Sequence, residues 1–221
     1  SKFPEIKDLN TPKLWDTKFK ASSTLDEQDE MTQDRVRTAF SYITKNSKRL
    51  LDIGAGQGFL EELVSKMLNT EMYATDFSKI SIGSLKRRFK GNFKVESLYR
   101  LRYKKNFFDT ICILEVLEHI PPSKIFIFLK KVNFILKQRG MLIVSVPMDE
   151  NLEKMEDNPS GHVRDYTRNT IISELENSGF KVVKYKELYA FSENYILKKF
   201  IAKILKNKWK PNNIVIKAIK R

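Results

Sequence analysis

Apolar and polar positions alternate in blocks along the first 147 residues, and the blocks have the lengths of strands and helices. Short apolar runs predict strands, and stretches with apolar residues every three or four positions predict helices between them. Strands alternating with helices are typical of an α/β protein with a doubly wound, mostly parallel sheet. The predicted strands are 50–53, 71–75, 93–95, 107–114 and 141–147, and the predicted helices are about 31–45, 60–68, 79–89 and 123–136, the last ended by Gly140.

The rest of the chain adds two strands, which makes seven, and further helices. Trp15 and Phe19 lie four positions apart, so they form one face of a short helix that packs on or covers another part of the protein. Thr24 or Asp26 is a candidate cap for the helix that follows. Beyond residue 150, the pattern predicts a helix at 167–179, a strand at 180–188, a basic amphipathic helix at 192–209 and a strand at 213–219.

The length and composition predict one folded domain. The chain has 221 residues, 41% of them hydrophobic, and 15 Phe, which excludes a disordered protein. We find no signal-peptide pattern and no apolar run near the ~20 residues of a membrane-spanning helix. The single cysteine, Cys112, lies in an apolar run, so it is a core thiol and no disulfide framework is possible. We therefore expect a cytoplasmic protein with N-terminal cap helices (1–45), a ligand-binding core (46–150) and a substrate-side half (151–221).

The charge is concentrated at the C-terminus. The net charge is +14, and residues 181–221 contain 12 Lys and Arg against 2 Glu. This asymmetry predicts an anionic partner near the C-terminus, such as nucleic acid, acidic lipid or a phosphorylated substrate. The alternative is a solvated lysine-rich surface.

The stretch 49–60 carries the clearest chemical signal. A short strand is followed by Gly54, Gly56 and Gly58 and then by a helix. Glycines let the backbone turn tightly and approach a ligand, and the free amides of a helix start face it, so this stretch predicts a nucleotide-type site. Asp76 follows the second strand, 18 positions after Gly58, near the spacing at which an acid meets a ribose in dinucleotide sites. Alternatively, Asp76 or Ser78 only caps the next helix.

The spacing G-x-G-x-G preceded by Asp52, together with Asp76, Phe108-Asp109 and Glu115-Val116-Leu117-Glu118-His119, resembles the class I S-adenosylmethionine-dependent methyltransferases. The likeness is to the group that methylates quinones, lipids, sugars and other small molecules, and it covers about 33–221. It implies a Rossmann-like methyltransferase fold with the last strand antiparallel beside the fifth. It also implies S-adenosyl-L-methionine as cofactor and a small-molecule acceptor. The basic charge of the C-terminal part favours an anionic or lipid-linked acceptor, with nucleic acid as the alternative partner.

The resemblance also implies roles for individual residues. Asp52 would reach the cofactor's amino group, and Asp76 would hold its ribose hydroxyls. Glu96 stands beside the position at which the family often has an acid for the adenine amine. The other residues implied to contact the cofactor are Gly54, Ala55, Gly56, Gly58 and Glu115 at its methionine end, and Phe77, Ser97 and Leu98 at its adenine.

Candidate catalytic residues follow from what methyl transfer requires. The sulfonium already activates the methyl group, so the enzyme mainly aligns an acceptor, and a base is needed only if the acceptor loses a proton. His119 is either a candidate base or a structural histidine bonded to a carbonyl. His162 and Tyr166 are the other catalytic candidates. Arg164 binds an anionic acceptor or forms a loop salt bridge, and Trp15 is a second substrate-side candidate.

The same residues suggest a rival function. Glu115, Glu118, His119 and His162 make a plausible set of ligands for a divalent metal. The methyltransferases that modify the terminal ribose of small RNAs use a similar set. The Glu-Val-Leu-Glu-His motif is also frequent in metal-free relatives, so we expect catalysis to need no metal.

The basic helix at 192–209 carries an apolar stripe with lysines largely away from it. Such a helix can lie on an acidic membrane surface. The alternative is a helix that packs on the sheet and keeps its lysines in water. The stripe consists of Tyr195, Ile196, Leu197, Phe200, Ile201, Ile204 and Leu205, and the lysines are Lys198, Lys199, Lys203, Lys206 and Lys208.

Overall fold

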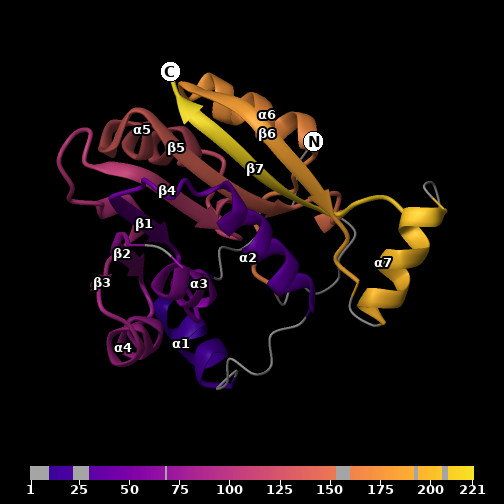
Figure 1. Ribbon diagram of the computed structural model, residues 1–221, viewed down its shortest axis with the longest axis horizontal. Helices are drawn as coiled ribbons and strands as arrows, with labels where there is room; N and C mark the ends of the chain where they lie inside the picture. The colour runs from indigo at the N-terminus through magenta and orange to yellow at the C-terminus, as the bar shows by residue number, and fades with distance from the viewer. Residues whose placement is uncertain (1–9, 22–29, 68, 153–159, 192–193, 206–208) are drawn as a thin grey trace.

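A computed structural model describes residues 10–21, 30–67, 69–152, 160–191, 194–205 and 209–221. Its centre is one seven-stranded sheet in the order β3-β2-β1-β4-β5-β7-β6 (Figure 1). The first five strands are parallel, and β7 lies antiparallel between β5 and β6. The sequence-based prediction of the sheet and of its antiparallel last strand is confirmed. The strands are β1 (Arg49–Ile53), β2 (Glu71–Asp76), β3 (Asn92–Val95), β4 (Phe108–Leu114), β5 (Leu136–Pro147), β6 (Phe180–Leu188) and β7 (Asn213–Lys220).

Helices cover both faces of the sheet and bury a core on each. The helices are α1 (Pro12–Ala21), α2 (Glu30–Tyr42), α3 (Phe59–Met67), α4 (Lys79–Arg88), α5 (Ile125–Ile135), α6 (Arg168–Asn177) and α7 (Tyr195–Ile204). Helices α5 and α6 pack on one face through side chains such as Phe128 and Leu175. Helices α2, α3 and α4 pack on the other through side chains such as Ala39, Val64 and Leu85. This arrangement leaves the carboxyl ends of the parallel strands open for a site.

Two element boundaries differ from the prediction at the end of α5. The helix ends at Ile135, and β5 begins at Leu136, so Gly140 lies inside the strand and is not the helix stop. The strand starts early because Phe108 pairs with Leu136 before the register shifts and Thr110 pairs with Met141. Within 98–106, which the pattern predicts as loop, residues Leu98–Arg100 form a single 3-10 turn.

Helix α7 is shorter than predicted and does not pack on the sheet. It spans Tyr195–Ile204, whereas the expected start at Ser192 and the candidate caps Thr24 and Asp26 fall outside the described residues. In Figure 1 it projects from the edge of the molecule near the junction of β6 and β7. The described part of the chain contains no helix that is both long enough and apolar enough to cross a bilayer.

Candidate functional site

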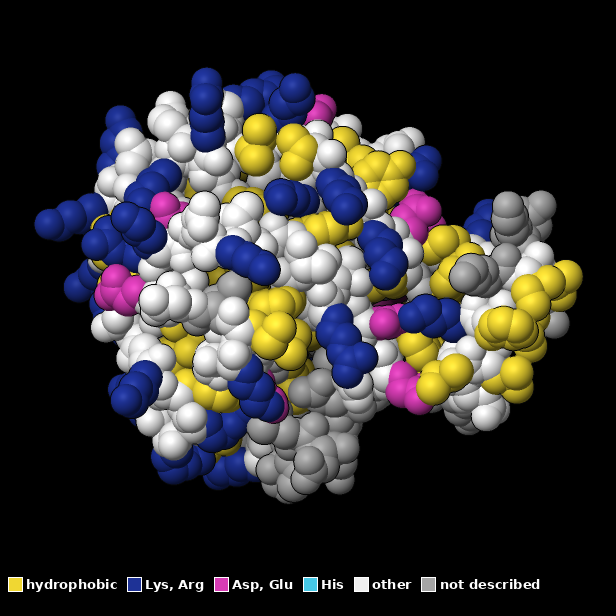
Figure 2. Space-filling model, viewed as in Figure 1, with side chains coloured by type: hydrophobic (Ala, Val, Ile, Leu, Met, Phe, Trp, Pro, Cys, Tyr) yellow, Lys and Arg dark blue, Asp and Glu magenta, His cyan; other side chains and the backbone are white. Residues whose placement is uncertain are grey.

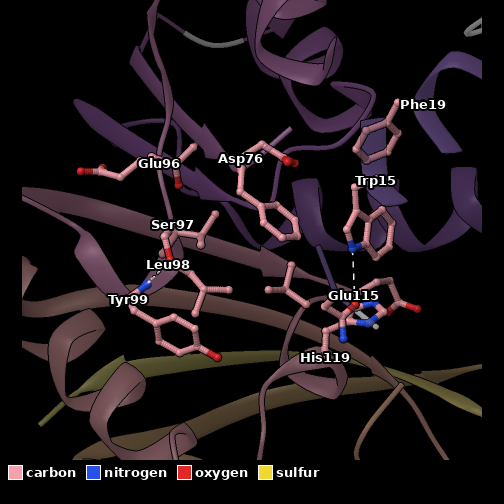
Figure 3. A pocket seen from close by; sticks show the side chains of 15 residues that line it. Trp15, Phe19, Asp76, Glu96, Ser97, Leu98, Tyr99, Glu115 and His119 are labelled. Atoms are coloured by element: carbon pink, nitrogen blue, oxygen red, sulfur yellow. Dashed lines mark hydrogen bonds between the residues drawn. The ribbon is translucent and has the colours of Figure 1, made fainter. Parts of the chain in front are cut away.

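A cavity opens at the carboxyl ends of β1, β2 and β4, where the glycine-rich turn, the start of α4 and helix α1 meet (Figure 3). It encloses about 900 Å³ including its mouth, which is in the range of pockets for ligands of nucleoside size. A second cavity adjoins it on the side of α2 and the loop at 160–162. The two share Trp15, Phe19, Gly54, Glu115 and His119.

The glycine-rich turn has a backbone that only glycine adopts easily. Gly54 has a φ of 79°, and a Cβ there would lie 2.4 Å from Cγ2 of Val116. Gly54 and Gly56 line the cavities, as predicted, together with Ala55. Gly58, which directly precedes α3, lines neither cavity and packs against Leu85 of α4. Its place beside the cofactor stays a prediction, and its observed contacts are those of close packing between α3 and α4.

Asp76 connects the glycine-rich turn to the start of α4. One carboxylate oxygen accepts the N–H of Gly56 at 2.9 Å, and the other accepts the N–H of Ser78 at 2.8 Å. Ser78, not Asp76, is the N-cap of α4, since its hydroxyl accepts the N–H of Ser81. Burial raises the pKa of Asp76, and the two N–H bonds oppose that rise. Asp76 lines the first cavity beside the glycine-rich turn, and its ribose-binding role stays a prediction.

Two acids lie buried behind the turn. Burial raises the pKa of Asp52 to about 7. Burial and the nearby charge of Asp52 raise the pKa of Glu61, in the first turn of α3, well above its usual value. The two carboxyl groups lie against each other, so a proton held on one can be donated to the other. Asp52 also lines the second cavity.

The far end of the first cavity is lined by apolar and hydroxyl-bearing side chains. Phe77, Ser97 and Leu98 all lie there, and their contact with an adenine stays a prediction. Ser97 also caps the 3-10 turn by accepting the N–H of Tyr99. Glu96 lines the same end, but its carboxylate points away from Asp76 and Trp15 in Figure 3. This end of the cavity therefore offers a hydroxyl group where the family often has an acid.

Helix α1 covers the two cavities. Asp16 accepts the hydroxyl of Ser78 at 2.5 Å, which fastens the helix to the start of α4. On its other side, Asn10 donates to the carbonyl of Gly161 at 2.9 Å. Trp15 and Phe19 then face the cavities, so the predicted helix that covers another part of the protein is confirmed.

Side chains from three elements hold Glu115. It ends β4 with a φ of 55°, a conformation that costs a non-glycine residue energy. Its carboxylate accepts the Ser145 hydroxyl at 2.7 Å and the Asn213 amide at 3.2 Å, and it forms an ion pair with Arg35 at 3.3 Å. The sequence analysis missed these three partners, because they come from α2, β5 and β7 and only the folded sheet brings them together. Glu115 lines the pocket as predicted, but its carboxylate is engaged by them.

Two histidines face each other where the cavities meet. The rings of His119 and His162 lie 4.8 Å apart, and Trp15 packs edge-on against His119. Nδ1 of His119 lies 3.2 Å from the carbonyl of Gly161, which only accepts, so the neutral ring carries its proton there. Burial lowers the pKa of His119 to about 4, which makes it a weak base. Nδ1 of His162 lies 2.7 Å from the carboxylate of Glu150, so the neutral ring accepts a proton at Nε2.

Glu118 lies beside both rings. Its carboxyl group is fully buried, and neither oxygen has a hydrogen-bond partner among the described residues. Burial and the charge of Glu115 raise its pKa well above the usual value. Atoms of Glu118, His119 and His162 that can bind metal lie within 4.8 Å of one another. The predicted set of four ligands is therefore reduced to three, because Glu115 is held by Arg35.

Tyr166 and Arg164 are not in the site. Tyr166 is 1% exposed and donates its hydroxyl to Glu174 at 2.7 Å. Arg164 forms an ion pair with the same glutamate and packs its guanidinium over the Tyr166 ring. The predicted catalytic role of Tyr166 and substrate-side role of Arg164 are thus corrected to a structural one, since both side chains fasten the 164–166 segment to α6. Glu150, which the sequence analysis missed, provides the partner of His162 instead.

Comparisons with known proteins agree with this architecture. An uncharacterised protein of Methanocaldococcus jannaschii is 29% identical over 165 residues, which cover 73% of this chain and 68% of that protein. A SAM-dependent methyltransferase from Archaeoglobus fulgidus superposes with a TM-score of 0.71 at 21% identity, over 92% of this chain and 99% of its own.

The N-methyltransferase NodS from Bradyrhizobium japonicum, solved with S-adenosyl-L-homocysteine, has a TM-score of 0.71 at 14% identity, over 94% of this chain and 98% of its own. These structural likenesses concern the fold. The family model of the methyltransferase domain matches residues 25–185, which include the glycine-rich turn, Asp76 and both histidines. This match covers well over half of the chain, and the protein belongs to the methyltransferase domain family.

Proposed function

We propose that the protein binds S-adenosyl-L-methionine with its nucleoside in the first cavity and its methionine end reaching Asp52 and Gly56 in the second, and that it transfers the methyl group to a small-molecule acceptor on the His162 side of the second cavity. The observation that carries the proposal is that the two cavities meet at Gly54, Glu115 and His119. The methyl group of the donor and the reacting atom of the acceptor would therefore meet beside these residues. Helix α1 covers that place and limits the access of water.

The residues present fit this cofactor. Asp76 offers a carboxylate to ribose hydroxyls, and the glycine-rich turn leaves no room for a Cβ at Gly54. Asp52 lines the second cavity, and a bound ammonium group there would favour the charged form of its carboxyl. Phe77 and Leu98 provide an apolar surface for a base. When bound, S-adenosyl-L-methionine supplies a methyl group on a positively charged sulfur, which leaves as a neutral thioether as the acceptor bonds to the methyl carbon.

The chain's own contribution is mainly to position the reactants. Glu115 is rigid because Arg35, Ser145 and Asn213 hold it, so it can fix one side of the reacting centre. His162 can accept a proton at Nε2 if the acceptor is a hydroxyl or an ammonium, and Glu150 then stabilises the charged ring. His119 keeps its ring neutral, and its bond to the carbonyl of Gly161 fixes the orientation of the ring where the two cavities meet.

Cationic side chains near the second cavity favour an acceptor with an anionic group. Lys18 and Arg35 both line that cavity. Arg35 is paired with Glu115, and Lys18 donates to the carbonyl of Ser160 at 3.3 Å. The ammonium of Lys18 also lies 4.5 Å from the centre of the Trp15 ring, which lines the same cavity. Lipid, sugar and quinone acceptors with a phosphate or carboxylate fit this charge.

A second candidate function is metal-dependent methylation of an RNA ribose. One observation favours it: Glu118, His119 and His162 gather metal-binding atoms, and the carboxyl of Glu118 has no hydrogen-bond partner among the described residues. A divalent ion would have to displace the proton that burial holds on Glu118. Chelator-treated enzyme distinguishes the two. Retained activity supports the metal-free reaction, and activity lost and then restored by magnesium, manganese or cobalt supports the RNA reaction.

The proposal is tested by transfer of labelled methyl from S-adenosyl-L-methionine to extracts of lipids, sugars, quinones and RNA. Label in one of the first three classes supports it. Label in RNA alone supports the second candidate. A protein that binds the cofactor but labels no extract would contradict both. An Asp76→Ala variant serves as the control, since it should lose transfer to every class alike.

A further inference from the structure

The exposed side of helix α7 is apolar, which is the reverse of a helix that packs on a protein core. Ile196, Leu197, Phe200 and Ile204 are between 59% and 69% exposed. Positions 196, 200 and 204 recur every four residues and 197 lies beside them, so the four side chains form one stripe. Tyr195 and Ala202 are buried and face the body of the protein. Figure 2 shows the apolar side chains gathered on the part that projects.

The helix is fastened to the protein by its opposite side. The hydroxyl of Tyr195 donates to Asp34 of α2 at 2.7 Å, and Lys199 forms an ion pair with the same carboxylate. The Phe191 ring contacts Trp209 at 5.3 Å, which ties the segments on either side of α7 together. These contacts hold the stripe in place, turned away from the sheet. The sequence-based alternative of a helix packed on the sheet is therefore wrong.

We propose that the stripe of Ile196, Leu197, Phe200 and Ile204 docks the protein onto the surface of an anionic lipid bilayer. A helix of this length is about 15 Å long, and an interfacial helix places its apolar face in the headgroup region while its polar sides stay in water. Binding of this kind needs neither the methyl donor nor the acceptor.

Charge complementarity favours a lipid surface. Residues 181–221 carry 12 Lys and Arg against 2 Glu, so the end of the chain that contains α7 is strongly cationic. Lys198 lies over the Phe191 ring, and Lys210 is exposed next to Trp209. Lysines beside an apolar stripe attract anionic headgroups, and a Trp ring suits the boundary between water and lipid.

The other possible occupants fit less well. A second copy of the chain also carries +14, so two copies repel each other as they approach. A nucleic acid would gain little from Ile196, Leu197 and Ile204, because aliphatic side chains neither stack on bases like aromatic rings nor form hydrogen bonds.

The test is co-sedimentation of the full chain with vesicles of phosphatidylglycerol and phosphatidylcholine in equal parts, or of phosphatidylcholine alone. At low salt, we expect binding to the acidic vesicles at least about tenfold tighter than to the neutral ones, and weaker binding at high salt. The double variant Phe200→Gln/Ile204→Gln should bind the acidic vesicles at least about tenfold more weakly than the wild type. Both side chains are exposed, so the variant should keep the wild-type melting temperature.

A matched control is Ile127→Gln on α5, which is also a large exposed aliphatic side chain and lies on another helix. It should bind acidic vesicles like the wild type. The proposal is overturned if the wild type stays in solution with acidic vesicles at low salt, or if the double variant binds as well as the wild type. It is also overturned if sedimentation without lipid shows a dimer that the double variant abolishes, since the stripe then joins two copies.

Discussion

Glu61→Gln should stabilise the ligand-free protein, and the gain should grow with pH. Glu61 is 1% exposed, and its carboxyl lies against that of Asp52. Burial and the charge of Asp52 raise its pKa well above the usual value, so the folded state keeps a proton that the unfolded state loses above about 4.5. A group with a raised pKa stabilises the folded state fully at low pH, and this contribution is lost as pH rises toward the folded pKa.

The magnitude follows from the number of protons retained. Each proton that only the folded state keeps costs about 1.4 kcal/mol of unfolding free energy per pH unit. Above about pH 5 the wild type should therefore lose stability relative to Glu61→Gln, in which the position no longer titrates, at up to this rate until the pH reaches the folded-state pKa of the Asp52–Glu61 pair. The two proteins should be equally stable near about pH 5, because an amide and a protonated carboxyl have nearly the same shape and polarity.

Urea unfolding across this pH range measures the difference. The matched control is Glu62→Gln, the next residue on α3, whose carboxylate pairs with Lys66 at 2.6 Å at the surface. It should change stability by at most about 1 kcal/mol, with the pH trend of the wild type. A stability difference between wild type and Glu61→Gln that stays constant with pH, or falls as pH rises, would refute the assignment of a retained proton to this pair.

Three further variants probe the site. Asp76→Ala should weaken binding of S-adenosylhomocysteine by about 1.5–3 kcal/mol, measured by calorimetry, because charge-assisted hydrogen bonds are lost; unchanged affinity would remove Asp76 from the ribose site. Gly54→Ala should cost about 1–3 kcal/mol of stability by thermal unfolding and abolish cofactor binding, since its φ is 79° and a Cβ would meet Val116; a wild-type melting temperature would contradict this. With an acceptor in hand, Glu150→Gln should lower kcat about tenfold or more without changing cofactor affinity. An unaffected kcat would show that His162 takes no proton.

Much of the fold follows from local patterns in the sequence. Each apolar run of the parallel sheet is bounded by polar residues and has the length of a strand, so the pattern predicts its position. The antiparallel strand β6 also begins and ends where the pattern predicts. The prediction fails at Gly140 because the strand register, set by pairing between Phe108 and Leu136, overrides the helix-stopping preference of glycine. The orientation of α7 also escapes a sequence pattern, since periodicity identifies an apolar stripe but not the side that meets the protein.

The candidate site likewise contains residues that the sequence predicts and residues that it does not. Asp52, Gly54 and Asp76 are predictable because they lie next to strand ends, and the sheet brings strand ends together. Glu150 is not, since its pairing with His162 depends on how two loops fold back. Tyr166 was expected in the site from its nearness to His162 in the chain, but its hydroxyl turns to Glu174 in the core.

Isothermal titration calorimetry of the wild-type protein with S-adenosylhomocysteine and, separately, with NAD tests the central claim most directly. We predict that S-adenosylhomocysteine binds at a single site per chain and that NAD gives no heat. The reasons are the spacing from Asp52 to Gly58, the place of Asp76 beside the glycine-rich turn, and the match to the methyltransferase domain family. Tight binding of NAD with no response to S-adenosylhomocysteine would contradict the account.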